Sequence, residues 1–128
     1  MKVLAVDDDP RTLELLASVL EPQGFQLLKA CGGREGIAIA ETEHPDLIIL
    51  DLLMPNMNGF EVIDRLDNSP ATTTRLPIII FTVKQLTAEE KRRLKGRIVG
   101  LVRKADFNPK GFVGMVRNAL QRNLGWIT

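Results

Sequence analysis

Short apolar runs that end in a carboxylate constrain the fold of this chain more than any other feature. Residues 47–50 read Leu-Ile-Ile-Leu, follow the turn-forming pair Pro45-Asp46, and end at Asp51. Such a run is typical of a strand buried on both faces, as strands are in parallel sheets. Asp51 then lies at the carboxyl end of its strand, which is the edge where open α/β sheets bind ligands. The pattern predicts a chemical role for this carboxylate.

A second run has the same form. Residues 3–6 read Val-Leu-Ala-Val and precede Asp7, Asp8 and Asp9. If the two strands are parallel neighbours, Asp7 and Asp8 meet Asp51 at one sheet edge. Two carboxylates about 4 Å apart repel each other by roughly 4 kcal/mol at an effective dielectric of about 20. A cation or a shared proton must offset that repulsion, and an all-oxygen site open to water suits Mg²⁺ before Ca²⁺.

Strands alternate with helices along the chain. Asp9-Pro10 has the form of an N-cap followed by proline in the first helical turn, and Thr87 with Glu90 forms a capping-box pattern. Asn108 and Asp106 are alternative caps for the last helix. Five alternations imply a parallel sheet with helices on both faces and right-handed crossovers. We expect strands near 3–6, 25–30, 47–50, 78–81 and 98–102, helices beginning near 10, 34, 60, 87 and 108, one domain over 1–122, and a tail at 123–128.

Composition sets the broad class. The chain has 128 residues, 45% hydrophobic and 26% charged, as expected of one ordinary globular domain. The N-terminal apolar run is too short for a signal peptide, and no run approaches the roughly 20 apolar residues of a membrane span. A single cysteine, Cys31, excludes an intramolecular disulfide and a cysteine-based zinc site. We therefore expect a cytoplasmic protein.

Charge is distributed unevenly. Residues 1–83 carry six basic against 13 acidic side chains, a net −7, whereas residues 84–128 carry 11 against three, a net +8. Such asymmetry can mark a nucleic-acid surface. The sequence contains no helix-turn-helix, zinc-finger or aromatic–basic RNA motif. We therefore favour a solvated helical face at 91–97 and expect no nucleic-acid binding through this domain.

Side chains at the ends of four strands form a chemical set: the acid pair, Asp51, Thr82 and Lys104. A carboxylate nucleophile, metal-binding acids, a hydroxyl and a lysine are what phosphoryl transfer to an aspartate needs. From residue 2 to about 120 the chain resembles the receiver domain of bacterial two-component response regulators. The resemblance rests on the order acid pair, Asp, Thr, Lys, on Met-Pro-x-x-x-Gly at 54–59, and on the spacing from Thr82 to Lys104.

The resemblance implies a flavodoxin-like, doubly wound sheet of five parallel strands in the order 2-1-3-4-5 with five helices. It implies that Asp51 accepts a phosphoryl group from a phosphohistidine or a small acyl phosphate. Asp8 would bind Mg²⁺ directly and Asp7 through water. Asp51 and the backbone carbonyl of Leu53 would complete the protein's ligands.

Thr82 would donate its hydroxyl to the phosphoryl group, and Lys104 would pair first with Asp51 and then with a phosphoryl oxygen. Each polar role stabilises charge in the transition state. An ordinary β-branched strand end remains an alternative for Thr82, and a strand-end acid for Asp7. Strand alternation and family spacing favour Lys104 over Arg103 as the inward cation.

The resemblance also implies partners and a mode of action. We expect a sensor histidine kinase or a histidine phosphotransfer domain as phosphodonor and an unknown downstream protein as target. The chain would be a switch with at most weak self-phosphorylation and self-dephosphorylation, rather than a metabolic enzyme. It would be a stand-alone regulator or the receiver piece of a longer protein, such as a hybrid sensor kinase.

Three positions depart from the family pattern. Ala105 replaces the proline that usually follows the lysine, Leu101 replaces an aromatic residue, and Val83 replaces a small residue after the threonine. A cis peptide is not expected without proline. We expect phosphoryl capture to persist and output to depend on loops and surface charge more than on an aromatic rotamer. The apolar Leu53, which with Lys84 flanks the approach of water, suggests slow self-dephosphorylation.

Other functions remain as alternatives. A pseudo-receiver would keep the fold as an unphosphorylated interaction module, and Mg²⁺ binding would discriminate. A phosphatase with an aspartyl intermediate usually carries a second Asp where Leu53 stands, so turnover of phosphoesters is disfavoured. A flavin carrier is disfavoured because the three aspartates at 7–9 would repel a phosphate.

Overall fold

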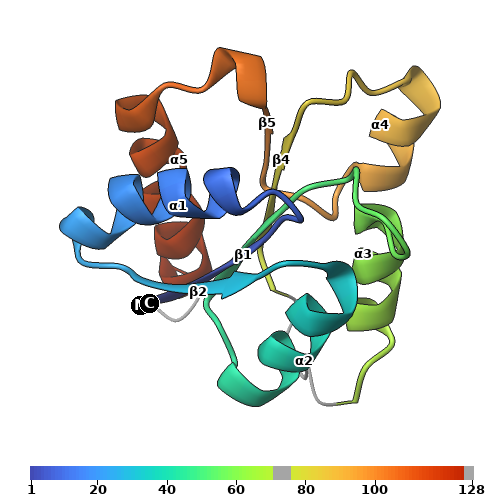
Figure 1. Cartoon of the computed structure of the whole chain (residues 1–128), viewed down its shortest axis with the longest axis horizontal. Coiled ribbons are helices and arrows are strands. Elements are labelled where there is room, and N and C mark those ends of the chain that lie inside the picture. Colours follow the sequence, from blue (N-terminus) through green and yellow to red (C-terminus); the bar gives the residue numbers. More distant parts are fainter. Residues whose placement is uncertain (71–75, 126–128) are drawn as a thin grey trace.

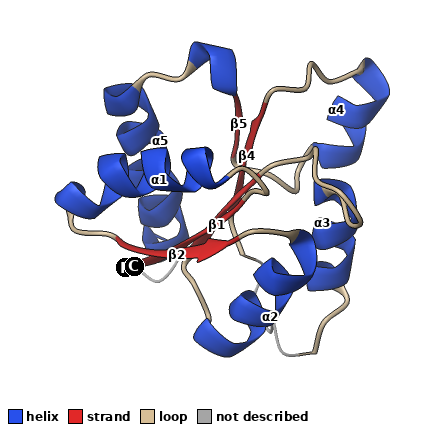
Figure 2. Ribbon diagram, in the orientation of Figure 1, coloured by secondary structure: helices blue, strands red, loops and turns tan. Residues whose placement is uncertain are grey.

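Five parallel strands form one sheet in the order β2-β1-β3-β4-β5, which confirms the predicted fold and strand order. The computed structural model describes residues 1–70 and 76–125. Figure 2 shows the strands enclosed by helices. The strands are β1 (Lys2–Val6), β2 (Gln26–Ala30), β3 (Leu47–Leu50), β4 (Ile78–Thr82) and β5 (Gly100–Arg103). The helices are α1 (Pro10–Leu20), α2 (Gly33–Glu43), α3 (Gly59–Asp67), α4 (Ala88–Leu94) and α5 (Pro109–Gly125), with 3₁₀ turns at Glu21–Gln23 and Lys104–Asp106.

The helices cover both faces of the sheet, α1 and α5 on one and α2, α3 and α4 on the other (Figure 1). Successive strand residues point to opposite faces. Thus Ile49 packs in the core under α1 and α5, whereas Ile48 and Leu50 pack under the other three helices. This double burial explains why the central strands β1, β3 and β4 are continuous apolar runs, whereas the edge strands β2 and β5 carry exposed polar residues.

The register of the strands brings their carboxyl ends together. Val6 pairs with Leu50, and Leu50 pairs with Ile80. Asp7 and Asp51 therefore follow directly on paired residues, and the backbone N–H of Asp51 donates to the carbonyl of Val6 at 3.1 Å. The sheet itself positions the acidic residues that the sequence singled out.

Helix ends follow the predicted caps. Asp9 accepts a hydrogen bond from the Arg11 backbone N–H, and Thr87 with Glu90 forms a reciprocal capping box. At the last helix, Gly111 N–H donates to Asn108 Oδ1 at 3.0 Å, which decides between the two candidate caps. Helix α5 continues to Gly125, so residues 123–125, expected in the tail, extend that helix. Residues 126–128 lie outside the described part of the chain.

Among the described residues, no helix is both long enough and apolar enough to cross a membrane.

Candidate functional site

Asp51 is a buried carboxylate at the end of the central strand β3. Only 4% of its surface is exposed, and its Oδ1 accepts a hydrogen bond from the Leu53 backbone N–H at 3.2 Å. Gly59 supports this turn, because its N–H donates to the Leu52 carbonyl at 3.1 Å. A Cβ at position 59 would lie 2.6 Å from the Asp51 carbonyl oxygen. The glycine of the Met-Pro-x-x-x-Gly motif is therefore required by close backbone approach.

Asp7 and Asp8 join Asp51 at this edge. One carboxylate oxygen from each of the three residues lies within 4.8 Å of the others. Asp7 is 2% exposed and Asp8 is exposed. Asp7 Oδ1 accepts the backbone N–H of Asp9 at 2.9 Å, which orients the carboxylate. Three converging carboxylates, one open to solvent, form a donor set that can hold a hard divalent cation.

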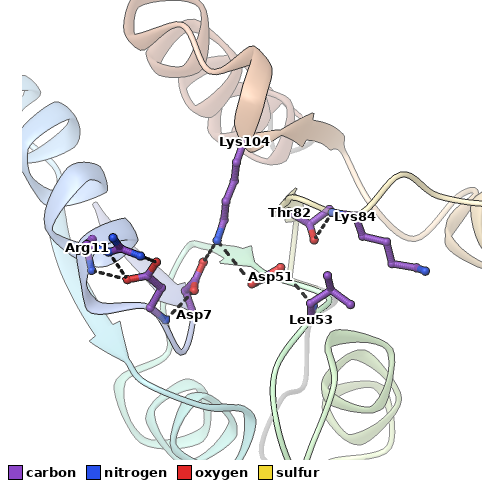
Figure 3. A network of polar contacts seen from close by, with 8 residues as sticks. Asp7, Arg11, Asp51, Leu53, Thr82, Lys84 and Lys104 are labelled. Carbon is purple, nitrogen blue, oxygen red and sulfur yellow. Dashed lines mark hydrogen bonds and ion pairs between the residues drawn. The ribbon is translucent and has the colours of Figure 1, made fainter.

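Lys104 reaches the same site from the turn that follows the edge strand β5. Its Nζ lies 2.7 Å from Asp7 Oδ2 and 3.5 Å from Asp51 Oδ2 (Figure 3). The expected pairing with Asp51 is present, but the shorter contact is to Asp7. An ammonium placed between the two carboxylates offsets their mutual repulsion, which explains why it bridges both. Arg103, the alternative cation, is exposed.

Burial and neighbouring charges both shift the pKa values of Asp7 and Lys104. Burial raises the pKa of Asp7 above its ordinary value, and the nearby Asp51 adds to the rise, while the hydrogen bonds from Lys104 and Asp9 oppose it. Burial alone would lower the pKa of Lys104, but its contacts with Asp7 and Asp51 outweigh that effect and raise it. Lys104 is therefore a fixed positive charge at neutral pH.

Thr82 completes the expected group. Its side chain is fully buried at the end of β4, and Figure 3 shows it across Asp51 from Asp7. Its Oγ1 accepts the Lys84 backbone N–H at 3.3 Å. The structure thus brings Asp7, Asp8, Asp51, Thr82 and Lys104 to one edge, with the backbone of Leu53 beside Asp51.

The three positions that depart from the family pattern lie directly after β4, within β5 and in the turn after β5. Val83 is 60% exposed and Leu53 is 47% exposed, so two apolar side chains face solvent beside the site. Leu101 is 38% exposed and lines a cavity of about 390 Å³ between α4 and β5. Every peptide bond in the described residues is trans, including the one before Ala105. The absence of a cis bond there was expected from the missing proline.

Sequence reasoning missed one neighbour of the site. Glu90 holds the Lys84 ammonium, with Oε2 3.5 Å from Nζ. The sequence had shown Glu90 only as a capping-box residue. Nothing in a local pattern signals an ion pair across the loop before α4, because the pairing depends on the path of that loop.

Comparison with known proteins shows the protein family to which the chain belongs. The sequence model of the response regulator receiver domain matches residues 3–117, so the chain belongs to that family. Protein PilH of Pseudomonas aeruginosa is 41% identical over 83 residues, which cover 65% of this chain and 68% of PilH. The DNA-binding response regulator MtrA of Mycolicibacterium smegmatis is 35% identical over 124 residues, which cover 95% of this chain and 51% of MtrA. The chain therefore spans about half the length of MtrA.

Solved structures agree with this assignment. Chemotaxis protein CheY4 of Vibrio cholerae has a TM-score of 0.79 at 31% identity, covering 92% of this chain and 97% of CheY4. The signal receiver domain of a signal transduction histidine kinase from Syntrophus aciditrophicus has a TM-score of 0.80 at 28% identity, covering 94% of this chain and 89% of that domain. Both of these solved structures thus share the fold of this chain.

Proposed function

We propose that this chain is a phosphoacceptor switch that takes a phosphoryl group from a phosphohistidine onto Asp51 in a Mg²⁺-dependent reaction and thereby changes its contacts with another protein. One observation carries the proposal. Asp51, 4% exposed, shares an edge with the Asp7 and Asp8 carboxylates and with the Lys104 ammonium. Membership of the receiver family supports it.

The acidic residues would hold the metal. Asp8 would bind Mg²⁺ directly and Asp7 through water, with Asp51 and the Leu53 carbonyl completing the ligands. The carboxylates that converge within 4.8 Å fit such an ion, because their mutual repulsion favours a divalent cation. When bound, Mg²⁺ would neutralise charge on the phosphoryl oxygens during transfer.

The transfer itself needs one nucleophile. An Asp51 carboxylate oxygen attacks phosphorus, the new O–P bond forms, and the P–N bond of the phosphohistidine breaks with its electron pair returning to the imidazole nitrogen. Thr82 donates its hydroxyl hydrogen to a phosphoryl oxygen, and its Oγ1 can at the same time keep accepting the Lys84 backbone N–H. Lys104 moves from its carboxylate partners to another phosphoryl oxygen. Positioned charges of this kind lower the barrier without covalent chemistry of their own.

The product is a signal rather than a released compound. We infer a stoichiometric switch with at most weak self-phosphorylation and self-dephosphorylation, partnered by a sensor histidine kinase or a histidine phosphotransfer domain and acting in the cytoplasm. Output would pass to a downstream protein through protein contacts. With Leu101 at the usual aromatic position, loops and surface charge would carry the change.

Intact-protein mass spectrometry tests the proposal. The chain is incubated with acetyl phosphate and Mg²⁺, beside an Asp51→Asn variant and a sample with excess chelator. We expect one added phosphoryl group on the wild type with Mg²⁺ and none on the other two samples. An unmodified wild type that also fails to bind Mg²⁺ would support the pseudo-receiver instead.

A further inference from the structure

Lys84 is a second cation near the site, and it is turned away from Asp51. Its backbone N–H donates to Thr82 Oγ1 at 3.3 Å. Its side chain points away from Asp51 in Figure 3, and its Nζ lies 3.5 Å from Glu90 Oε2. Lys84 is thus tied at its backbone to the candidate site and at its tip to α4.

Glu90 is held in place by the start of α4. Its Oε1 accepts the Thr87 backbone N–H at 2.9 Å, and its own N–H donates to Thr87 Oγ1 at 3.1 Å. The first hydrogen bond holds the Glu90 carboxylate and the second holds its backbone, and neither involves Lys84. The hydrogen bond from the Thr87 N–H, more than the Lys84 charge, holds the pKa of Glu90 below its ordinary value, so the carboxylate is charged at neutral pH.

We propose that Glu90 is a positioning residue that withholds Lys84 from phosphorylated Asp51 and thereby sets the lifetime of the phosphoryl group. This inference rests on the proposed function. The Lys84 side chain is 31% exposed and that of Glu90 is 20% exposed. Partly solvated ion pairs are weak, whereas an ammonium ion on a phosphoryl group makes a charge-assisted hydrogen bond. Lys84 therefore divides its time between the two anions once Asp51 is phosphorylated.

Movement of the Lys84 side chain from Glu90 to the phosphoryl group would affect hydrolysis, because Lys84 lies two residues after Thr82 at the end of β4. Water must attack phosphorus in line with the Asp51 oxygen that leaves, from the solvent side. Leu53 and Val83, each within two residues of Asp51 or Thr82, carry side chains that are 47% and 60% exposed. A Lys84 side chain drawn onto the phosphoryl group would lie across this approach and slow hydrolysis. Glu90, by holding Lys84, keeps the approach open.

The inference predicts opposite effects for the two partners. Lys84→Ala removes the covering side chain and should shorten the phosphoryl lifetime. Glu90→Gln should lengthen it, because glutamine preserves the capping box but gives up the ion pair. The double variant should behave like Lys84→Ala alone, since Glu90 acts only through Lys84. A merely structural role for either residue would move both lifetimes in one direction.

The experiment measures first-order loss of the phosphoryl group by intact mass after loading with acetyl phosphate and Mg²⁺ and removal of the donor. Each lifetime should change by about two- to fivefold, because a partly exposed ion pair shifts an equilibrium by no more than a factor of this size. Glu89→Gln is the matched control, because it removes an exposed charge from the same helical turn. It should leave the lifetime unchanged. Lys84→Met, which keeps a long side chain without its charge, replaces Lys84→Ala if the latter fails to fold.

The possible outcomes distinguish failure of the inference about Glu90 from failure of the proposed function. A wild type that is labelled on Asp51, with a Glu90→Gln lifetime equal to or shorter than the wild-type value, overturns this inference alone. A double variant longer-lived than Lys84→Ala does the same, because it shows that Glu90 acts without Lys84. A wild type that takes up no phosphoryl group overturns the proposed function and this inference with it.

Discussion

Replacing Lys104 with methionine tests the electrostatic design of the site most directly. The Lys104 ammonium lies 2.7 Å from Asp7 and 3.5 Å from Asp51, and these two carboxyl groups are 2% and 4% exposed. Methionine keeps an unbranched side chain of similar length and removes the ammonium group with its charge and hydrogen-bond donors. The two buried carboxylates then face each other without their cation.

The expected loss follows from that burial. Removing one member of a buried ion pair typically costs about 3–5 kcal/mol. The Lys104 side chain is 18% exposed, so water partly replaces it. We therefore expect the lower end, about 3 kcal/mol of unfolding free energy. With a urea m value of about 2 kcal/mol per molar, the midpoint falls by about 1.5 M.

The assay is urea unfolding followed by circular dichroism at pH 7, with and without Mg²⁺. Arg103→Met is the matched control, because Arg103 is the exposed cation one residue earlier, and it should change the free energy by less than about 0.5 kcal/mol. Mg²⁺ should restore part of the loss in Lys104→Met by occupying the space between the carboxylates. Equal midpoints for the two variants without Mg²⁺ would refute the account of Lys104 as the cation that stabilises Asp7 and Asp51.

Three further predictions concern the same edge. Because the pKa of Asp7 is raised in the folded state, the folded chain binds a proton more readily than the unfolded chain, and stability should fall as pH rises from the ordinary carboxyl pKa of 3.8 through the raised pKa. Asp7→Asn should remove this slope in Mg²⁺-free urea titrations and be more stable than the wild type at pH 7. An unchanged slope would contradict the assignment. Gly59→Ala should lose about 1–3 kcal/mol by overpacking against the Asp51 backbone, whereas Gly114→Ala, where a Cβ meets nothing within 4 Å, should be neutral or stabilising in thermal melts. Leu53→Asn should shorten the phosphoryl lifetime measured by intact mass, since an amide can orient the attacking water that an exposed leucine cannot; a longer lifetime would argue against slow self-dephosphorylation through Leu53.

The local sequence pattern was sufficient for the architecture and for most of the site. The three central strands are short apolar runs because both faces of the sheet are covered there, and Asp7, Asp51 and Thr82 stand at their carboxyl ends. Parallel strands with aligned ends then bring Asp7 and Asp51 together without further information. The caps at Asp9 and Thr87 were also readable, since capping acts over a few residues. The end of α5 was not, because the sequence beyond 122 lacks a helical pattern although the helix reaches Gly125.

Contacts between distant segments were decided only by the tertiary structure. Residue type and spacing singled out Lys104, but the closer approach to Asp7 than to Asp51 depends on how the turn after β5 lies over β1 and β3. Lys84 and Glu90 are close in sequence, but their pairing still depends on the path of the loop before α4. Periodicity and capping report which way a side chain faces within its own element. Which oppositely charged group it meets is set by the packing of elements far apart in the chain, and no local pattern encodes that distance.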